Sequence, residues 1–183
     1  LSGWSKVYLD HQANKPKITG RILNVMKGQT NGHEGDIVSG FFPYLYLLNS
    51  RKNVMHILDY ELSIKVDKKW IRLKRVYGME KHDVMYFQGA DENQLTMHNF
   101  KNNLIYKKDA PVQHGVPLHG WLVFSGAEEL YSAVIEEYKL VCIDAGFKRH
   151  VVVTKKTDMF DLKLLQQIAE MTVPDNYKFP PRR

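Results

Sequence analysis

Residues 59–66 read Asp59-Tyr60-Glu61-Leu62-Ser63-Ile64-Lys65-Val66, and this stretch decides the fold class. Apolar or aromatic side chains alternate with polar ones along all of it, which is the period of a β-strand with one buried and one solvent-exposed face. Residues 70–77 continue in the same way, with Ile71 and Leu73 on one side of the strand. The two stretches together predict an antiparallel hairpin.

The turn between these two strands determines which residues face each other. A four-residue turn over 67–70 pairs Val66 with Ile71 and Ile64 with Leu73, so that the apolar side chains share one face. A two-residue turn at 68–69 gives the same pairing, but it needs a positive φ at two lysines, which is costly. We therefore expect the longer turn.

Short strands are expected on both sides of this hairpin. Residues 41–48 are apolar on both faces, as is typical of a strand inside a sandwich, and Pro43 marks the beginning of that strand or a bulge. A hairpin is expected around Asp144-Ala145-Gly146, with Gly146 available for a positive φ. The two arms of that hairpin are 138–143 and 148–154. The remaining strand patterns cover 17–27, 84–88, 95–100, 104–107 and 119–124.

Two helices are predicted. Ser125 stands three residues before Glu128, which is the spacing of a capping box and predicts a brief helix there. A longer helix is expected over 157–173, capped by Thr157 or Asp158, because apolar residues recur at helical spacing. The chain then divides into an N-terminal extension (1–16), a sandwich domain (17–156), this C-terminal helix and a loose tail (174–183).

The fold class follows from composition and from the strand pattern. The chain of 183 residues, 44% apolar and 25% charged, fits one globular domain. The longest stretch without a charge or histidine, 37–50, is too short to cross a bilayer, so no transmembrane segment is expected. About seven to nine short strands without βαβ alternation predict a mainly β protein, an antiparallel β-sandwich with a C-terminal helix. A barrel is the alternative.

The expected sandwich resembles immunoglobulin-like domains in its pattern of strands. The resemblance concerns architecture alone, because antibody domains carry paired cysteines around a tryptophan and this chain has one cysteine, Cys142. That cysteine lies in an apolar strand, where desolvation raises the pKa of a thiol and leaves it inert. We therefore expect Cys142 to be a core residue.

The common catalytic motifs are missing from the sequence. Neither Ser39 nor Ser125 lies in a Gly-x-Ser-x-Gly elbow, and neither a phosphate-binding loop nor a dinucleotide fingerprint occurs. Four of the eight histidines lie between Gly78 and Gly120. Among these, His114 and His119 are the alternative metal ligands, although their spacing matches no established zinc motif. We expect neither a cofactor nor a metal.

Positive charge is concentrated in the expected hairpin. The formal charge is +6, and residues 65–81 contain seven basic and two acidic residues. Three of the basic side chains project from one face with Trp70, and two more crown the turn. The candidate ligand-binding residues are therefore Lys65, Lys68, Lys69, Trp70, Arg72 and Lys74.

This basic hairpin supports two interpretations. Cations with an interleaved aromatic ring can bind nucleic acid or anionic lipid. We favour the second interpretation, in which the charges prevent sheet-to-sheet aggregation and Asp59 and Glu61 partly neutralise them.

The sequence thus predicts a non-catalytic binding or structural module with an unknown protein partner. Its expected contacts are the hairpin and the loops between Gly78 and Gly120, because loops on a rigid scaffold commonly carry recognition. The alternatives are a metal-dependent hydrolase that uses 82–119, and nucleic-acid or anionic-lipid binding through 65–81. Because the chain starts at Leu1, an extracytoplasmic or membrane-tethered location is favoured over a cytoplasmic one.

Overall fold

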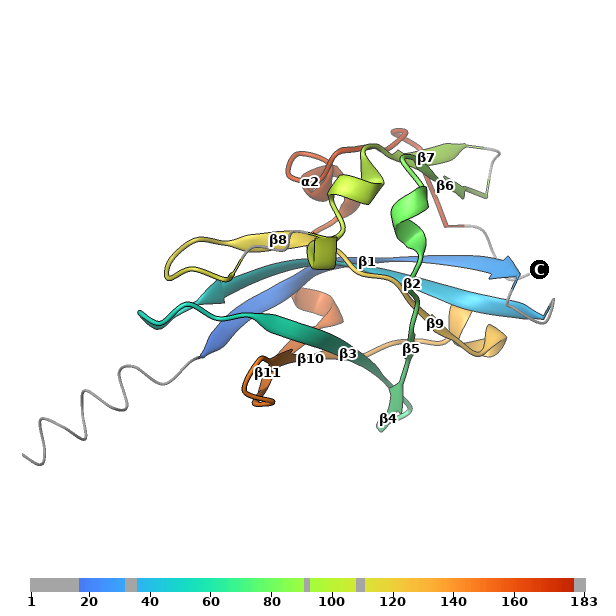
Figure 1. Ribbon diagram of the computed structural model, residues 1–183. Helices are drawn as coiled ribbons and strands as arrows, with labels where there is room; N and C mark the ends of the chain where they lie inside the picture. The colour runs from blue at the N-terminus through green and yellow to red at the C-terminus, as the bar shows by residue number, and fades with distance from the viewer. Residues whose placement is uncertain (1–16, 32–35, 91–92, 108–110, 180–183) are drawn as a thin grey trace, which may run out of the picture.

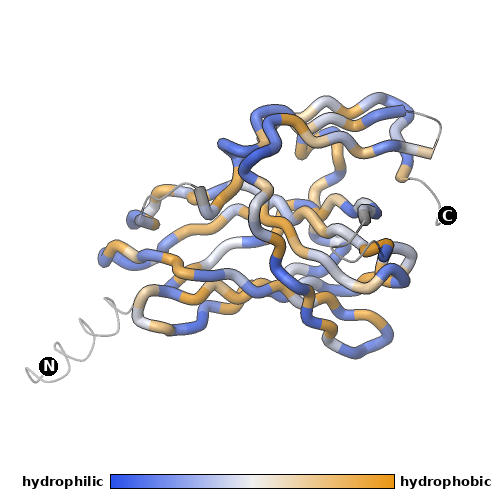
Figure 2. Tube along the Cα trace, turned by 45° about the vertical axis from the view of Figure 1, so that its right-hand side comes forward, coloured by the Kyte–Doolittle hydropathy of each residue, from blue (hydrophilic) through white to orange (hydrophobic). Residues whose placement is uncertain are grey.

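The computed structural model describes residues 17–31, 36–90, 93–107 and 111–179. The protein is mainly β, with 51% strand and 12% helix, and its strands form three antiparallel sheets. The sheets lie in three layers, the first in the middle, the second below it and the third above it (Figure 1). Along the tube in Figure 2, hydrophobic and hydrophilic residues alternate at short intervals, as expected for strands with two different faces.

The strands of each sheet are as follows. The first sheet contains β1 (Ile18–Asn31), β2 (Ile37–Asn49), β9 (Phe124–Gly126) and β5 (Lys74–Arg75) in that order, and β8 (Leu118–Trp121) also pairs with β2. The second sheet has the order β11 (Arg149–Lys155), β10 (Glu137–Asp144), β3 (Ile57–Val66) and β4 (Lys69–Arg72). The third has the order β12 (Met171–Thr172), β7 (Gln94–Met97) and β6 (Met85–Gln88).

Short helices connect these strands. The α-helix α2 spans Leu162–Leu165, and the 3₁₀ helices are η1 (Met79–Lys81), η2 (Phe100–Asn102), η3 (Ile105–Lys107), η4 (Glu128–Tyr131) and η5 (Lys156–Asp158).

The main core lies between the first and second sheets. Phe41 and Leu45 of β2 meet Leu62 of β3 and Leu140 of β10 there, and all four are fully buried. At one side the chain passes from β4 to β5 through Leu73, whose N–H donates to the Leu62 carbonyl. At the other side β1 packs against β11. The two sheets are therefore joined on both sides of this core.

A second core covers the opposite face of β1 and β2. Phe42 and Tyr44 of β2 are buried there against Phe87 of the third sheet and Leu165 of α2. Strand β2 is thus buried on both faces, which confirms the prediction drawn from residues 41–48.

The turn of the β3–β4 hairpin differs from the prediction. Val66 pairs with Lys69 and Ile64 with Ile71, so the turn has two residues, Asp67 and Lys68, with φ of 48° and 65°. The expected four-residue turn is therefore wrong. Positive φ at both central residues matches the twist of the strands, and this gain outweighs the local strain. Because the register moves by two residues, each side chain keeps its expected face.

The basic stretch is divided between two sheets. The expected strand 70–77 ends at Arg72 as β4, and Lys74 belongs to β5 of the first sheet, where it pairs with Ser125 of β9. The prediction that Lys74 lies beside Arg72 on the hairpin is therefore wrong. Buried Leu73 at the corner between the sheets explains the break.

Several local predictions also differ from the structure. Residues 105–107 form η3 instead of a strand. Ser125 lies in β9 and caps no helix, and η4 has no side-chain cap. In the β10–β11 turn the positive φ of 59° belongs to Phe147 instead of Gly146. The hairpin itself is confirmed, with Val152 facing Leu140.

The C-terminal helix is much shorter than predicted. Instead of a helix over 157–173, α2 has four residues, and Asp161 caps it by accepting a hydrogen bond from the Leu164 N–H at 2.7 Å. The segment ends as β12, which pairs with β7. Pairing with an existing sheet outweighs the helical spacing of the sequence here. The described part of the tail is tied down through Lys178, whose carbonyl accepts from the Ala90 N–H at 2.9 Å. The extension 1–16 lies outside the described residues.

Candidate functional site

The basic hairpin carries its own counter-charges. Lys65 Nζ lies 2.9 Å from Glu137 Oε1, and Arg72 Nη2 lies 2.9 Å from Glu61 Oε1. Glu61 also accepts hydrogen bonds from Arg149, and these hold the pKa of its carboxyl below the usual range despite desolvation. The outer face of the second sheet is therefore largely neutralised.

The other candidate residues of the hairpin are spread out. Trp70 lies opposite Lys65 on the outer face, 40% exposed, with Lys139 Nζ 4.5 Å from its ring centroid. Lys68 and Lys69 are exposed at the turn. The structure therefore brings Lys65, Trp70 and Arg72 together and separates Lys74 from them. The arrangement supports the second interpretation, in which the charges of the hairpin prevent sheet-to-sheet aggregation.

The histidines of 82–119 are not gathered into a ligand set. His119 in β8 lies 2.8 Å, through Nδ1, from the hydroxyl of Tyr44, and burial raises the pKa of Tyr44 to about 12. His114 is exposed in the preceding loop. In the described ranges, no group of three or more His, Cys, Asp or Glu could hold a metal ion. The hydrolase alternative thus gains no support from these residues.

Cys142 lies in the core, as expected, and Ser39 is buried as well. Cys142 is fully buried in β10, and burial raises the pKa of its thiol to about 12, so it is protonated at neutral pH. Ser39 is also buried, and its hydroxyl donates to the Glu128 carbonyl at 2.9 Å. Both side chains have structural roles.

An open pocket of about 460 Å³ lies elsewhere, between the first and third sheets. Residues 27–30 of β1 and 85–89, which contain β6, line it, together with Phe42, Glu128 and Tyr131. In Figure 1, β6 lies above the C-terminal end of β1. We call the pocket the slot.

The slot runs along strand edges. Consecutive side chains of a strand point to opposite faces, so a pocket lined by four consecutive residues, 27–30, must lie against the edge of β1. The same argument places residues 85–88 with the edge of β6 toward the slot. Among the strands that the structure describes, both are terminal in their sheets. The slot is therefore bounded by two sheet edges.

The backbone of β1 points into this slot at alternate residues. Pro43 faces away from β1, because its carbonyl accepts from the Leu122 N–H at 3.0 Å, and its partner in β1 is Val25. In an antiparallel ladder such pairs alternate with hydrogen-bonded pairs. The N–H and C=O groups of Lys27 and Gln29 therefore point outward, as those of Val25 do.

The edge of β6 can be assigned in the same way. The Gly89 N–H donates to the Asn93 carbonyl at 2.6 Å, so Gly89 faces β7. Alternation then directs the backbone groups of Tyr86 and Gln88 away from β7, toward the slot. Ala90 obeys the same rule, because its N–H reaches the Lys178 carbonyl outside the sheet.

The floor of the slot is apolar. Gly28 of β1 pairs with Gly40 of β2, so the sheet carries no side chains there. A Cβ at Gly28 would lie 3.2 Å from the ring of Phe87, which shows how closely the third sheet approaches. Phe87 also meets Phe42 edge to face, with ring centroids 4.9 Å apart. The two glycines thus allow the aromatic rings to lie directly on the backbone.

Lys27 provides the positive charge at the slot. Its Nζ donates to the Tyr131 carbonyl at 2.7 Å and lies 5.8 Å from the centroid of the Tyr131 ring. Burial, and to a lesser extent the charge of Lys156, lower the pKa of Lys27. Among the described residues no carboxylate lies within ion-pair distance of Lys27, and this includes Glu128.

Sequence reasoning missed the slot. The predicted first strand ends at Lys27, because the glycines and polar residues of 28–35 are typical of a turn. In the structure β1 continues to Asn31, and the other wall comes from β6, far along the chain. The paired glycines, Gly28 and Gly40, are the sequence signal that points to a close backbone approach.

Comparisons with protein-family models, with curated proteins and with solved structures find no match. Within the part of the chain that the structure describes, each helix falls short of the length and apolar character needed to span a membrane.

Proposed function

We propose that the protein is a non-catalytic recognition module that binds a partner chain in the slot between β1 and β6. The observation that carries this proposal is the pocket itself, about 460 Å³ in volume, with an apolar floor and two strand edges as walls. A pocket of this size that combines an apolar lining with a few polar groups is the usual form of a binding site. For the architecture we propose an immunoglobulin-like sandwich, supported by two antiparallel sheets around one core.

Charge favours the slot over the basic hairpin. On the hairpin, Lys65 and Arg72 already have carboxylate partners within the protein. An external anion there would have to compete with Glu137 and Glu61, and exposed charge pairs contribute little to affinity. At the slot, the backbone groups of β1 and the ammonium of Lys27 are available to a ligand. A ligand can therefore form more new contacts at the slot than on the hairpin.

Selection from displayed peptides tests this function. Random peptides of about 12 residues, long enough to fill an extended binding groove, are displayed on phage and selected on the wild-type protein. The exposed Thr30 lines the slot, so Thr30→Trp fills it without touching the core. Val153→Trp is the control, because Val153 is exposed on β11 in the second sheet.

The expected result is that selected peptides bind wild type and Val153→Trp equally and do not bind Thr30→Trp. Binding that is unchanged by Thr30→Trp, or a selection that enriches no peptide, would contradict the proposed function. Turnover of a ligand by the purified protein would contradict its non-catalytic character.

A further inference from the structure

The two edges of the slot present a repeating hydrogen-bond pattern. The outward groups of β1 belong to Lys27 and Gln29, and those of β6 to Tyr86 and Gln88. Within the described residues none of these backbone groups has a hydrogen-bond partner. A donor and an acceptor on every second residue match an extended peptide, because a β-strand presents its own groups with the same period.

The size of the slot fits a short strand. The four residues of β1 that line it span about 13 Å, at about 3.3 Å per residue. Four residues of an added strand would cover the same length. Both faces of that strand would also find contacts, since residues of both faces of β1 line the slot.

The two faces of the slot differ in chemistry. One face holds the rings of Phe42 and Phe87, which suit an apolar side chain. The other face holds Lys27 and Tyr131. Because side chains of a strand alternate, one side chain would reach the aromatic face and the next would reach Lys27.

Lys27 favours a carboxylate on the second side chain. Its ammonium is half-buried, and its described hydrogen-bond partner is the neutral carbonyl of Tyr131. The nearby charge of Lys156 disfavours the ammonium further. A carboxylate would offset both effects through a charge-assisted hydrogen bond.

The outward edge beyond β6 already makes one hydrogen bond within the protein. Lys178 lies along the outward edge beyond β6 and accepts the N–H of Ala90 through its carbonyl at 2.9 Å. A backbone carbonyl from a distant segment thus already accepts a hydrogen bond from this edge, next to the slot.

We propose that the slot binds an extended peptide segment of a partner protein as an added β-strand on β1, and that Lys27 holds a carboxylate of that peptide. This inference rests on the proposed function and names its ligand class. The same selected peptides serve as probes, so that the function and the binding mode are tested separately.

The first test removes one outward N–H. Gln29→Pro deletes the N–H that faces the slot and leaves the hydrogen bonds between β1 and β2, which come from the neighbouring residues. Gln29→Ala removes the same side chain and keeps the N–H. We expect the Pro variant to bind the peptides at least about tenfold more weakly than the Ala variant, because a peptide carbonyl loses its donor.

The second test changes the peptide and leaves the protein intact. N-methylation of each peptide amide in turn should abolish binding at alternate positions only, since every second N–H of an added strand pairs with β1. Replacing the peptide carboxylate with an amide should weaken binding to wild type by about tenfold and have little effect on Lys27→Met.

The outcomes separate the two proposals. Suppose that the peptides do not bind Thr30→Trp, yet bind both Gln29 variants equally and show no alternation in the methylation series. This result would overturn strand addition and leave the proposed function standing. Selected peptides without a carboxylate, or with a carboxylate that is indifferent to Lys27→Met, would overturn the role of Lys27.

Discussion

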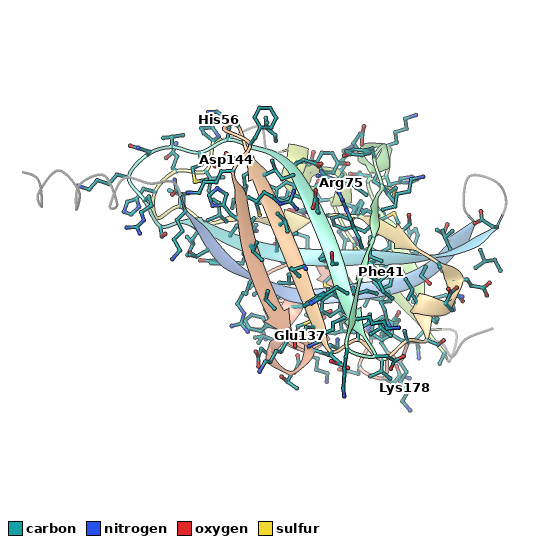
Figure 3. All side chains as sticks on the ribbon, turned by 90° about the horizontal axis from the view of Figure 1, so that it is seen from below. Phe41, His56, Arg75, Glu137, Asp144 and Lys178 are labelled. Carbon is teal, nitrogen blue, oxygen red and sulfur yellow. The ribbon has the colours of Figure 1, made fainter. Side chains whose placement is uncertain are left out.

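The charged side chains of the second sheet and of the slot differ in whether they have an oppositely charged partner among the described residues. In the second sheet the carboxylates have internal partners: Glu61 contacts Arg72 and Arg149, and the buried Asp144 contacts His150 at 2.8 Å. Figure 3 shows Asp144 and Glu137 at opposite ends of this sheet, each near a strand end. At the slot, Lys27 has no carboxylate within ion-pair distance among the described residues.

We expect this difference to determine which substitutions change stability and which change ligand binding. Paired groups gain little from a ligand, because binding would have to replace a contact that folding already supplies. Among the described residues, the outward backbone groups of β1 have no hydrogen-bond partner and Lys27 has no carboxylate partner, so a ligand adds an interaction there. We therefore expect substitutions in the second sheet to change stability, and substitutions at the slot to change binding.

The largest effect on stability is expected at Asp144. Its Oδ2 contacts His150 Nε2, and its Oδ1 accepts the N–H groups of Gly146 and Lys148, both at 2.9 Å. Asp144→Ala leaves these donors without their acceptor, so we expect the free energy of unfolding in urea to fall by about 3 kcal/mol. Asp144→Asn keeps an acceptor for the turn and should lose less. A loss below about 0.5 kcal/mol for the Ala variant would show that the pairing has no structural weight.

The second largest effect on stability is expected from acid, through the second sheet. Desolvation raises the pKa of Asp144, but the hydrogen bonds from His150 and the turn outweigh it and hold the pKa below its ordinary 3.8. A depressed pKa stabilises the fold fully above that ordinary value, and the contribution is lost as the pH falls through the folded pKa.

We therefore expect wild-type stability to drop below about pH 4, and to drop less steeply in Asp144→Asn. Urea unfolding between neutral pH and acid measures this slope. Equal slopes in the two proteins would contradict the assignment.

A smaller effect is expected at Glu61. Glu61→Gln removes the charge that pairs with Arg72 and Arg149, and because both arginines are largely exposed the loss should be about 1 kcal/mol or less. The loss should shrink in high salt. Asp83→Asn, which breaks the exposed pair with Lys101, is the control and should change stability less than Glu61→Gln does. A salt-independent loss at Glu61 would argue against an electrostatic origin.

The smallest effect on stability is expected at Lys27. Its pKa is lowered chiefly by burial, so the charged form is disfavoured by folding, and stability should rise as the pH passes through the folded pKa. Lys27→Met removes that charge and retains the apolar stem, so unfolding at neutral pH should change by about 0.5 kcal/mol or less. A loss above about 2 kcal/mol would mean that Lys27 is a structural residue like Asp144.

The sequence predicts well what alternation alone encodes. The faces of β3 and β4, the burial of β2 on both sides and the β10–β11 hairpin all follow from the spacing of apolar residues. The exact turn at Asp67 and Lys68 does not, because a two-residue shift leaves every face unchanged and the pattern cannot distinguish the registers.

Elements that depend on distant partners were not predictable. Met171 follows the helical spacing of 157–173, yet it pairs with Met97 as a strand. The slot depends on the approach of β6 to Gly28, and no local pattern records that contact. Charge alone identified the candidate residues of the basic hairpin and the expected neutralisation by Glu61, whereas the pairing of Lys65 with Glu137 depends on the distant strand β10.

The most direct test is amide hydrogen exchange in the free protein, followed residue by residue by NMR. We predict that the N–H groups of Lys27 and Gln29 exchange at least about tenfold faster than those of Met26 and Gly28, which face β2 in the ladder. Equal protection of all four amides would show that the edge of β1 is already covered, and it would contradict the slot as a binding site.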